Sequence, residues 1–259
     1  HTVPLLASFE HVDPITKKTE YYMLFPCADG SLFDYWFTQK AKHSAKNKEH
    51  VKLMINQFIG LLKALDSFHQ LSFKIEGGSP APRHARHCDV KPANIFAFKN
   101  GLGDKTTPIF VLGDFGSVRF GGDKAIGDMS FRAPESQLKG VKESTKADIF
   151  SLGCCLLEYV TWLLKDNKAV EHFSDIRVEK DILGSTNDSF FTVDKTATIP
   201  TLKKSVTAWL NDLLKHPDCT PALREILNIT EQNMMNPVAQ TRLDAKQVIT
   251  KLETTLKKI

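Results

Sequence analysis

The stretch His87-Cys88-Asp89-Val90-Lys91-Pro92-Ala93-Asn94 decides how this sequence of 259 residues is interpreted. It places a carboxylate, an amine and an amide at fixed offsets on what we expect to be one tight loop. Further along the chain, Asp114-Phe115-Gly116 adds a second carboxylate beside a flexible glycine turn. A carboxylate that receives a hydroxyl proton, an amine that neutralises a phosphate, and an amide and a carboxylate that hold Mg²⁺ are the groups that phosphoryl transfer requires. The two stretches therefore predict a phosphoryl-transfer site.

The composition is that of an ordinary globular protein, with 42% hydrophobic and 25% charged residues. Lysine and arginine are scattered, and a net charge of +4 gives little support for a nucleic-acid surface. The most apolar run, Ile149 to Leu164, has only 16 residues and contains Glu158, so we expect a buried core helix rather than a membrane span. We therefore expect no nucleic-acid partner and no membrane partner.

The cysteines indicate a reducing compartment. Their number is odd, no CxxC pair occurs and two are adjacent, so we expect neither a disulfide framework nor a zinc site. The five cysteines are Cys27, Cys88, Cys154, Cys155 and Cys219. We expect a cytoplasmic location, with the nucleus left open. The sequence begins at His1 without an initiator Met or a charged leader, which we interpret as a fragment or as a gene model that lacks its upstream part.

The order of predicted elements favours an α+β fold, because a few strands come first and a helical mass follows. Val3 to Phe9 and Tyr21 to Phe25 predict an antiparallel hairpin that turns at Asp13-Pro14. Ile95 to Phe98 and Ile109 to Leu112 predict two further strands. Between Gly184 and Lys195 we expect an irregular stretch. The expected helices cover Leu32 to Phe37, Val51 to Phe68, Asp148 to Leu164, Leu202 to Lys215, Ala222 to Met235 and Ala245 to Lys257.

Five motifs in this order resemble those of the eukaryotic protein kinase domain. They are the loop His87 to Asn94, with Cys88 where the family has Arg; Asp114-Phe115-Gly116; Ala133-Pro134-Glu135; Asp148-Ile149-Phe150-Ser151-Leu152-Gly153; and Arg242, which the family pairs with Glu135. The resemblance implies a protein-kinase-like α+β fold. Residues 1–30 would be the remnant of a truncated small lobe, with its strand hairpin and the hinge. Residues 31–259 would be a complete, mainly helical large lobe.

The resemblance also implies roles for the polar residues of the two opening stretches. Asp89 would accept the proton of the substrate hydroxyl, and Lys91 would contact the γ-phosphate of ATP. Asn94 and Asp114 would hold Mg²⁺, which prefers a few hard oxygen ligands completed by phosphate and water. A lysine at position 91 resembles Ser/Thr kinases rather than Tyr kinases. The implied cofactors are ATP and Mg²⁺, and the implied partner is a protein substrate.

The segment after the hairpin would bind adenine. By the same resemblance, Phe25 and Cys27 would offer backbone C=O and N–H groups to the base, and Leu24 would be the gatekeeper. Leucine-rich strands are common in any core, so simple packing is the alternative interpretation of Leu24.

Several motif residues have a structural interpretation beside the functional one. We expect His87 to pack under Phe115 rather than to act as an acid or base, and Asp148 to anchor the backbone of the catalytic loop. A pair between Glu135 and Arg242 would be structural. Cys154-Cys155 would fill the core, and Gly101-Leu102-Gly103-Asp104 would form a hairpin turn rather than a phosphate loop.

The sequence departs from the family pattern in three ways. Cys88 removes the guanidinium that would bind a phosphate on the activation segment, so we expect no phosphate switch by that route. Asp128 stands where Ser/Thr kinases have a Thr, and a second carboxylate near Asp89 would compete for Lys91. No glycine-rich loop, small-lobe lysine or partner glutamate precedes the first strand, although an active kinase needs the Lys–Glu pair.

Two functional hypotheses follow. The first is a Ser/Thr protein kinase domain that transfers the γ-phosphoryl group of ATP to protein hydroxyls, with weak or no activity in this fragment. The alternative is a pseudokinase or truncated interaction module without catalysis. A narrower resemblance, to an expanded set of fungal protein kinases, rests on Arg86 to Ile95, Leu156 to Leu164, Asp188-Ser189-Phe190-Phe191 and Trp209.

Overall fold

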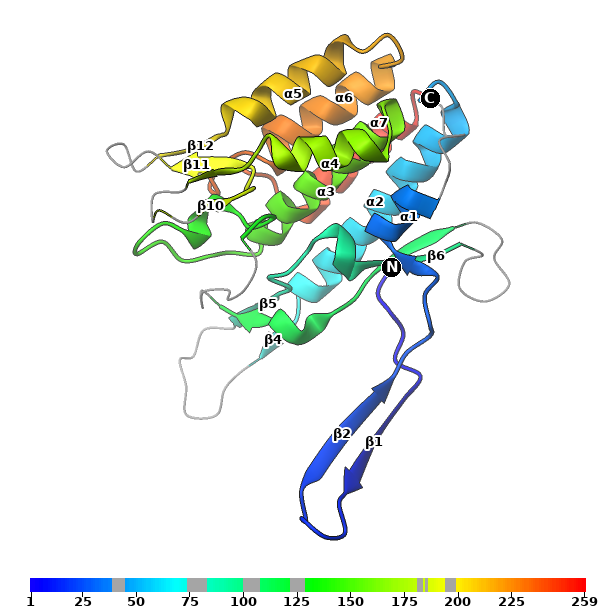
Figure 1. The fold of residues 1–259 in the computed structure, drawn as a ribbon, viewed down its shortest axis with the longest axis vertical. Coiled ribbons are helices and arrows are strands. Elements are labelled where there is room, and N and C mark those ends of the chain that lie inside the picture. Colours follow the sequence, from blue (N-terminus) through cyan, green and yellow to red (C-terminus); the bar gives the residue numbers. More distant parts are fainter. Residues whose placement is uncertain are drawn as a thin grey trace.

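A hairpin of two strands extends away from a body built mainly of helices (Figure 1). The computed structural model describes residues 1–38, 45–73, 83–99, 108–121, 129–180, 184, 186–193 and 199–259. The mixture of strands and helices confirms the α+β prediction. Asp128 and the Gly101-Leu102-Gly103-Asp104 turn lie outside the described residues.

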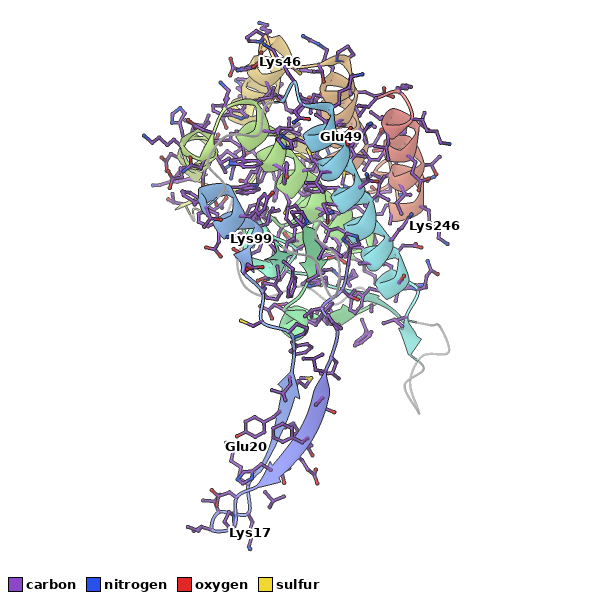
Figure 2. The ribbon with its side chains drawn as sticks, turned by 90° about the vertical axis from the view of Figure 1, so that its right-hand side faces the viewer. Lys17, Glu20, Lys46, Glu49, Lys99 and Lys246 are labelled. Carbon is purple, nitrogen blue, oxygen red and sulfur yellow. The ribbon has the colours of Figure 1, made fainter. Side chains whose placement is uncertain are left out.

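The hairpin pairs β1 (Ala7–Val12) with β2 (Thr19–Leu24) in antiparallel register. Its turn is closed by Asp13, whose Oδ1 accepts the backbone N–H groups of Ile15 at 2.8 Å and Thr16 at 2.7 Å, an arrangement typical of Asp in turns. Almost every residue of both strands is exposed to solvent. The hairpin therefore presents two open faces, and Lys17 at its tip lies far from the helices (Figure 2).

The first strand begins later than the sequence predicts, because residues 1–3 pair elsewhere. Thr2 forms a parallel bridge with Leu112, whose N–H donates to the carbonyl of His1 at 2.8 Å and whose carbonyl accepts the N–H of Val3 at 3.1 Å. Leu112 ends β7 (Ile109–Leu112), the outer strand of a sheet that also contains β3 (Gly30–Ser31) and β6 (Ile95–Phe98). The start of the chain is thus fixed to the body.

The helices form the body around one central helix. Their bounds are α1 Leu32–Thr38, α2 Lys48–His69, α3 Lys146–Leu164, α4 Asn167–Asp175, α5 Lys204–Lys215, α6 Pro221–Ile229 with a π-helical turn at Thr230–Met234, and α7 Ala245–Leu256. Every residue of α3 after Lys146 is buried. By length and composition α3 is also the candidate membrane span among the described helices, but its burial inside the protein makes it the core helix that the sequence predicts.

Side-chain caps fix where the helices begin. Asn47 caps α2 and Asp166 caps α4, each by accepting a backbone N–H from the first turn. Asp244 and Gln247 form a capping box at the start of α7, which satisfies two N–H groups that the helix leaves unpaired. The C-terminal end lies beside the start of α2, where the amine of Lys48 donates to the carbonyl of Ile259 at 3.1 Å (Figure 1).

The region between α3 and α5 differs from the prediction of an irregular stretch. Helix α4 was not expected, and two small strand pairs follow it: β9 (Glu179–Lys180) with β10 (Thr186–Asn187), and β11 (Phe191–Val193) with β12 (Pro200–Leu202). Their short runs carry too little periodicity to be recognised, but Phe191 and Val193 alternate into the core. A third small sheet joins β4 (Ser72–Phe73), β5 (Arg83–Arg86) and β8 (Arg119–Phe120).

Candidate active site

The loop after β5 is held by one buried carboxylate from α3. Asp148 accepts the backbone N–H of His87 through Oδ2 and that of Cys88 through Oδ1, each at 2.9 Å, and the ring Nε2–H of His69 at 2.8 Å. Burial by itself would raise the pKa of Asp148. The hydrogen bond from His69, the charge of the nearby histidine rings and the Cys88 N–H outweigh burial, so the pKa of Asp148 is lowered. Asp148 therefore stays ionised and anchors the loop, as the sequence predicts.

His87 is an architectural residue, also as predicted. Its Nδ1 accepts the backbone N–H of Asp89 at 3.3 Å, and its Nε2 lies 2.9 Å from the carbonyl of Gly113. Because a carbonyl can only accept, Nε2 is the donor in this contact. The ring centroid lies 5.1 Å from that of Phe115, which lies 5.6 Å from Phe68. His87 thus joins the loop to the turn that carries Asp114.

Asp89, Lys91 and Asn94 form one cluster on this loop. The amide nitrogen of Asn94 donates to the backbone carbonyl of Asp89 at 2.9 Å and to its carboxylate Oδ2 at 2.8 Å. The amine of Lys91 lies 3.2 Å from the same Oδ2. About a fifth of the side chains of Asp89 and Lys91 is exposed, 21% and 23% respectively. The carboxylate is therefore held by two polar partners and is in part accessible to solvent.

Asp114 is held in a backbone conformation that favours glycine, with φ of 55°. Its carboxylate accepts the N–H of Gly116 at 3.3 Å and so caps the short 3₁₀ turn Phe115–Ser117. The side chain is exposed. Strained conformations of this kind concentrate at functional sites.

Asn94 and Asp114 line the same cavity, together with the end of the hairpin. The cavity has a volume of about 670 Å³, which suits a small-molecule ligand. Its lining residues are mainly apolar: Val3, Met23, Phe25, Pro26, Ala28, Asn94, Phe96, Asp114, Phe115 and Gly116. The structure thereby brings Phe25 and the two proposed metal ligands together across 89 residues of sequence.

Leu24 and Cys27, two of the predicted adenine-binding residues, are not among the residues that line this cavity, and their role stays a prediction. Met23 and Ala28, their neighbours along the chain, do line it. Strand alternation explains why Met23 and not Leu24 lines the cavity, because neighbouring residues of β2 point to opposite faces. Leu24 is 52% exposed, so it is not the core residue of the alternative interpretation either. The alternation was available in the sequence and could have identified Met23.

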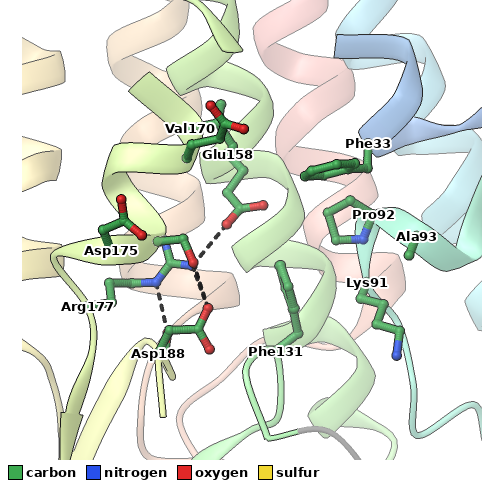
Figure 3. A pocket seen from close by; sticks show the side chains of 12 residues that line it. Phe33, Lys91, Pro92, Ala93, Phe131, Glu158, Val170, Asp175, Arg177 and Asp188 are labelled. Carbon is green, nitrogen blue, oxygen red and sulfur yellow. Dashed lines mark hydrogen bonds and ion pairs between the residues drawn. The ribbon is translucent and has the colours of Figure 1, made fainter. Parts of the chain in front are cut away.

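Lys91 and Pro92 help to line a second cavity, also of about 670 Å³ (Figure 3). In it, the buried Arg177 pairs with Glu158 at 3.1 Å and lies 3.6 Å from Asp188. The Arg177 guanidinium is stacked between the rings of Phe173 and Phe190, at 4.2 and 3.9 Å. The sequence did not predict this wall of the cavity, formed around Arg177, Glu158 and Asp188. A glutamate inside an apolar helix nevertheless indicates that a polar or charged partner is buried beside it.

The pKa values of Glu158 and Asp188, the two carboxylates near Arg177, shift in opposite directions. Burial raises the pKa of Glu158 to about 7, and Arg177 lowers it only in part. The pKa of Asp188 is lowered, because hydrogen bonds from Ser130 and Ser174 together with the charge of Arg177 outweigh its burial. Ser130 belongs to the segment before Ala133, so Asp188 ties that segment to the wall of the second cavity.

The residues present suit a magnesium–nucleotide complex. Asn94 uses its amide nitrogen toward Asp89, so its amide oxygen can accompany a carboxylate oxygen of Asp114 as a hard ligand. Two such ligands, completed by phosphate oxygens and water, are what Mg²⁺ prefers. No cluster of three or more His, Cys, Asp or Glu side chains occurs in the part of the chain that the structure describes, so an all-protein metal site is not offered there.

Comparison with known proteins identifies the family. The family model of the protein kinase domain matches residues 5–251. The chain belongs to the protein kinase family. The kinase domain is 28% identical over 158 residues to a probable serine/threonine-protein kinase of Streptomyces coelicolor, covering 58% of this chain and 20% of that protein. It is 24% identical over 181 residues to mitogen-activated protein kinase p38b of Drosophila melanogaster, covering 69% of this chain and 42% of the relative.

The kinase domain thus spans less than half the length of these relatives. Protein kinases use ATP and a divalent metal ion and act on protein substrates. A further kinase motif is also in place, since Arg242 and Glu135 form the predicted structural ion pair. Cys154 and Cys155 are buried in α3, which confirms their predicted place in the core of the kinase domain.

Proposed function

We propose that the chain is the catalytic domain of a Ser/Thr protein kinase, which transfers the γ-phosphoryl group of MgATP to protein hydroxyls. One observation carries the proposal: Asn94 and Lys91 hold the Asp89 carboxylate within 3.2 Å, and Asn94 and Asp114 line the same cavity. Phosphoryl transfer needs little covalent chemistry from the protein, so placing these groups around the reacting phosphate is most of catalysis.

Each residue has a role that follows from its charge and place. Asp89 accepts the hydroxyl proton, and Lys91 compensates the charge that develops on the γ-phosphate. Asn94 and Asp114 supply oxygen ligands to Mg²⁺. Met23 and Phe25 provide an apolar wall for adenine. Residues 1–30, which include the hairpin, form the small-lobe part of the nucleotide site. Lys91 and the Ser/Thr kinases among the relatives support serine and threonine as acceptors.

The test is transfer of radiolabelled phosphate from ATP to a generic acceptor such as myelin basic protein. Asp89→Asn should reduce kcat by about 10²-fold or more, the range that a general base supplies, and leave the affinity for MgATP unchanged. Glu225→Gln, which removes a carboxylate from an exposed pair with Lys258, is the matched control and should keep full activity. Equal activity of the wild type and Asp89→Asn would overturn the proposal.

Nucleotide binding without transfer is the second candidate. The cavity wall contributed by the hairpin favours it, since Met23 is 63% exposed and Phe25 42% exposed, which leaves the nucleotide site open to water. MgATP that binds the folded chain must raise the melting temperature. A shift that Asp114→Ala abolishes, in a chain without Asp89-dependent transfer, would establish this second function. Absence of any shift would exclude both functions.

We also propose an intracellular, cytoplasmic location. Its support is the state of the cysteines: all five are free thiols, and Cys154, Cys155 and Cys219 are buried. Free thiols persist where the surroundings are reducing. Immunofluorescence of the tagged full-length protein tests the location, and a secreted product would contradict it.

A further inference from the structure

Arg86, the residue directly before the catalytic loop, is a buried charge with defined partners. It is 1% exposed. Its Nη1 lies 2.6 Å from the carboxylate Oε2 of Glu143, which is also buried, and its Nε donates to the carbonyl of Gly121 at 3.1 Å. A guanidinium is removed from water only where charged and polar partners compensate it. The position of Arg86 is therefore determined by these contacts.

The Arg86 side chain joins three segments that act together in a kinase. Arg86 ends β5 and leads into His87, whose backbone is fixed by Asp148. Gly121 follows β8, at the beginning of the activation segment. Glu143 lies in the loop before α3, after the Ala133-Pro134-Glu135 motif. The backbone pairing of β5 with β8 brings the first two segments together, and the side chain of Arg86 adds the third.

Cys88 offers no cation at the place where the family has an arginine. Its thiol lies 3.6 Å from the carbonyl of Arg86, and burial, with the charge of Asp148, raises the pKa of Cys88 to about 12. A cation lies two residues earlier in the sequence, at Arg86, and contacts Glu143 and Gly121. Its anion is the carboxylate of Glu143, which belongs to the chain and is present without any modification.

We propose that the Arg86–Glu143 pair holds the catalytic loop and the start of the activation segment in the arrangement needed for transfer, so that no phosphorylated side chain is required. The inference rests on the proposed kinase function. Arg86 and Glu143 are positioning residues, which act through the backbone of His87 to Asp89 and through Gly121. Because the anion is a carboxylate of the chain, this anchor is permanent, and a phosphatase cannot remove it.

Two measurements on the full chain test the pair. In hydrogen–deuterium exchange, Glu143→Gln should raise uptake in peptides covering residues 84–90 and 118–121 and leave uptake in α7 unchanged. In transfer assays it should lower kcat at least about tenfold, since small misplacements of catalytic groups are costly, with the Kd of MgATP unchanged. Glu143→Asp, which keeps the charge, should restore part of kcat. Wild type treated with a broad-specificity phosphatase, its mass checked, should keep full activity.

A second variant covers the case in which Glu143→Gln fails to fold. Arg86→Met with Glu143→Leu replaces the buried pair by apolar side chains, an exchange that folded proteins tolerate, and it should show the same local exchange and the same loss of kcat. Unchanged exchange in both segments, or unchanged kcat in a folded variant, overturns the proposal. So does loss of wild-type activity after phosphatase treatment. A wild type without transfer contradicts the proposed function instead, and the exchange data then decide alone whether the pair positions the loop.

Discussion

Arg242 and Glu135 form a bidentate ion pair inside the protein, with Nη1–Oε1 and Nη2–Oε2 distances of 2.8 and 3.1 Å. The two side chains are 0% and 2% exposed. Nη1 of Arg242 also donates to the carbonyl of Lys146 at 2.8 Å, and the guanidinium lies 5.0 Å from the ring of Phe150. One side chain from the loop before α7 thus fixes both the end of the activation segment and the start of α3.

Removal of either partner should destabilise the fold strongly. Arg242→Ala leaves the Glu135 carboxylate buried and unpaired, so we expect a loss of about 3–5 kcal/mol in the free energy of unfolding. Urea denaturation measures it. Lys258→Ala, in the exposed pair with Glu225, is the control and should cost less than about 1 kcal/mol. Equal losses in the two variants would contradict the structural role of the buried pair.

The stability of the protein should fall as the pH rises toward 7, because of Glu158. Its pKa is raised by burial from 4.5 to about 7, so the folded state binds more protons than the unfolded state between these values. The contribution of Glu158 to the free energy of unfolding is then fully present below pH 4.5 and is lost as the pH rises through 7. Each pKa unit is worth about 1.4 kcal/mol, so the total is on the order of 3 kcal/mol.

Glu158→Gln should remove this pH dependence, because the amide does not titrate. Thermal unfolding followed from pH 4.5 to pH 8 measures the slope. The pKa of Asp188 is lowered, so its contribution to the pH dependence of stability lies below this pH range and has the opposite sign. Glu225→Gln should keep the wild-type slope. A Glu158→Gln variant that retains the full slope would show that Glu158 is not its source.

Cys88 should resist alkylation while Cys27 reacts. Cys27 is exposed, whereas Cys88 is half-buried with its pKa raised to about 12. At pH 8 roughly one Cys88 thiol in ten thousand is then ionised, and the thiolate is the reactive form. Iodoacetamide labelling followed by mass spectrometry measures both sites, and labelling in urea provides the reference in which the difference should vanish. Equal native rates would refute the buried, neutral thiol.

The hairpin should make the chain self-associate. Phe9 and Tyr22 stack at 5.2 Å on strands that are exposed on both faces, and unpaired strand edges with apolar side chains promote association. Light scattering should show a mean mass that rises with concentration. Phe9→Ser combined with Tyr22→Ser should reduce this rise. A monodisperse wild-type monomer at high concentration would contradict the expectation.

Much of the fold could be predicted from local patterns. The strands Ile95–Phe98 and Ile109–Leu112 have the predicted bounds, and α2 and α3 differ from prediction by only a few residues. Helix α4 and the small strand pairs after it were missed, because short elements carry too few repeats of their period to be recognised. Val3 was assigned to the hairpin but pairs with Leu112, which could not be predicted because it is a contact between distant parts of the chain.

The sequence by itself determined the family and indicated the proposed chemistry, because the proposed catalytic residues lie at short, fixed offsets along the chain. Asp89, Lys91 and Asn94 share one loop, and their offsets alone indicated that they would meet. Tertiary structure alone decided which partners the buried charges take. Arg86 pairs with Glu143, 57 residues away in the sequence, and Arg177 pairs with Glu158, 19 residues away. Burial makes such partners necessary, but only the packing of the folded chain selects which ones they are.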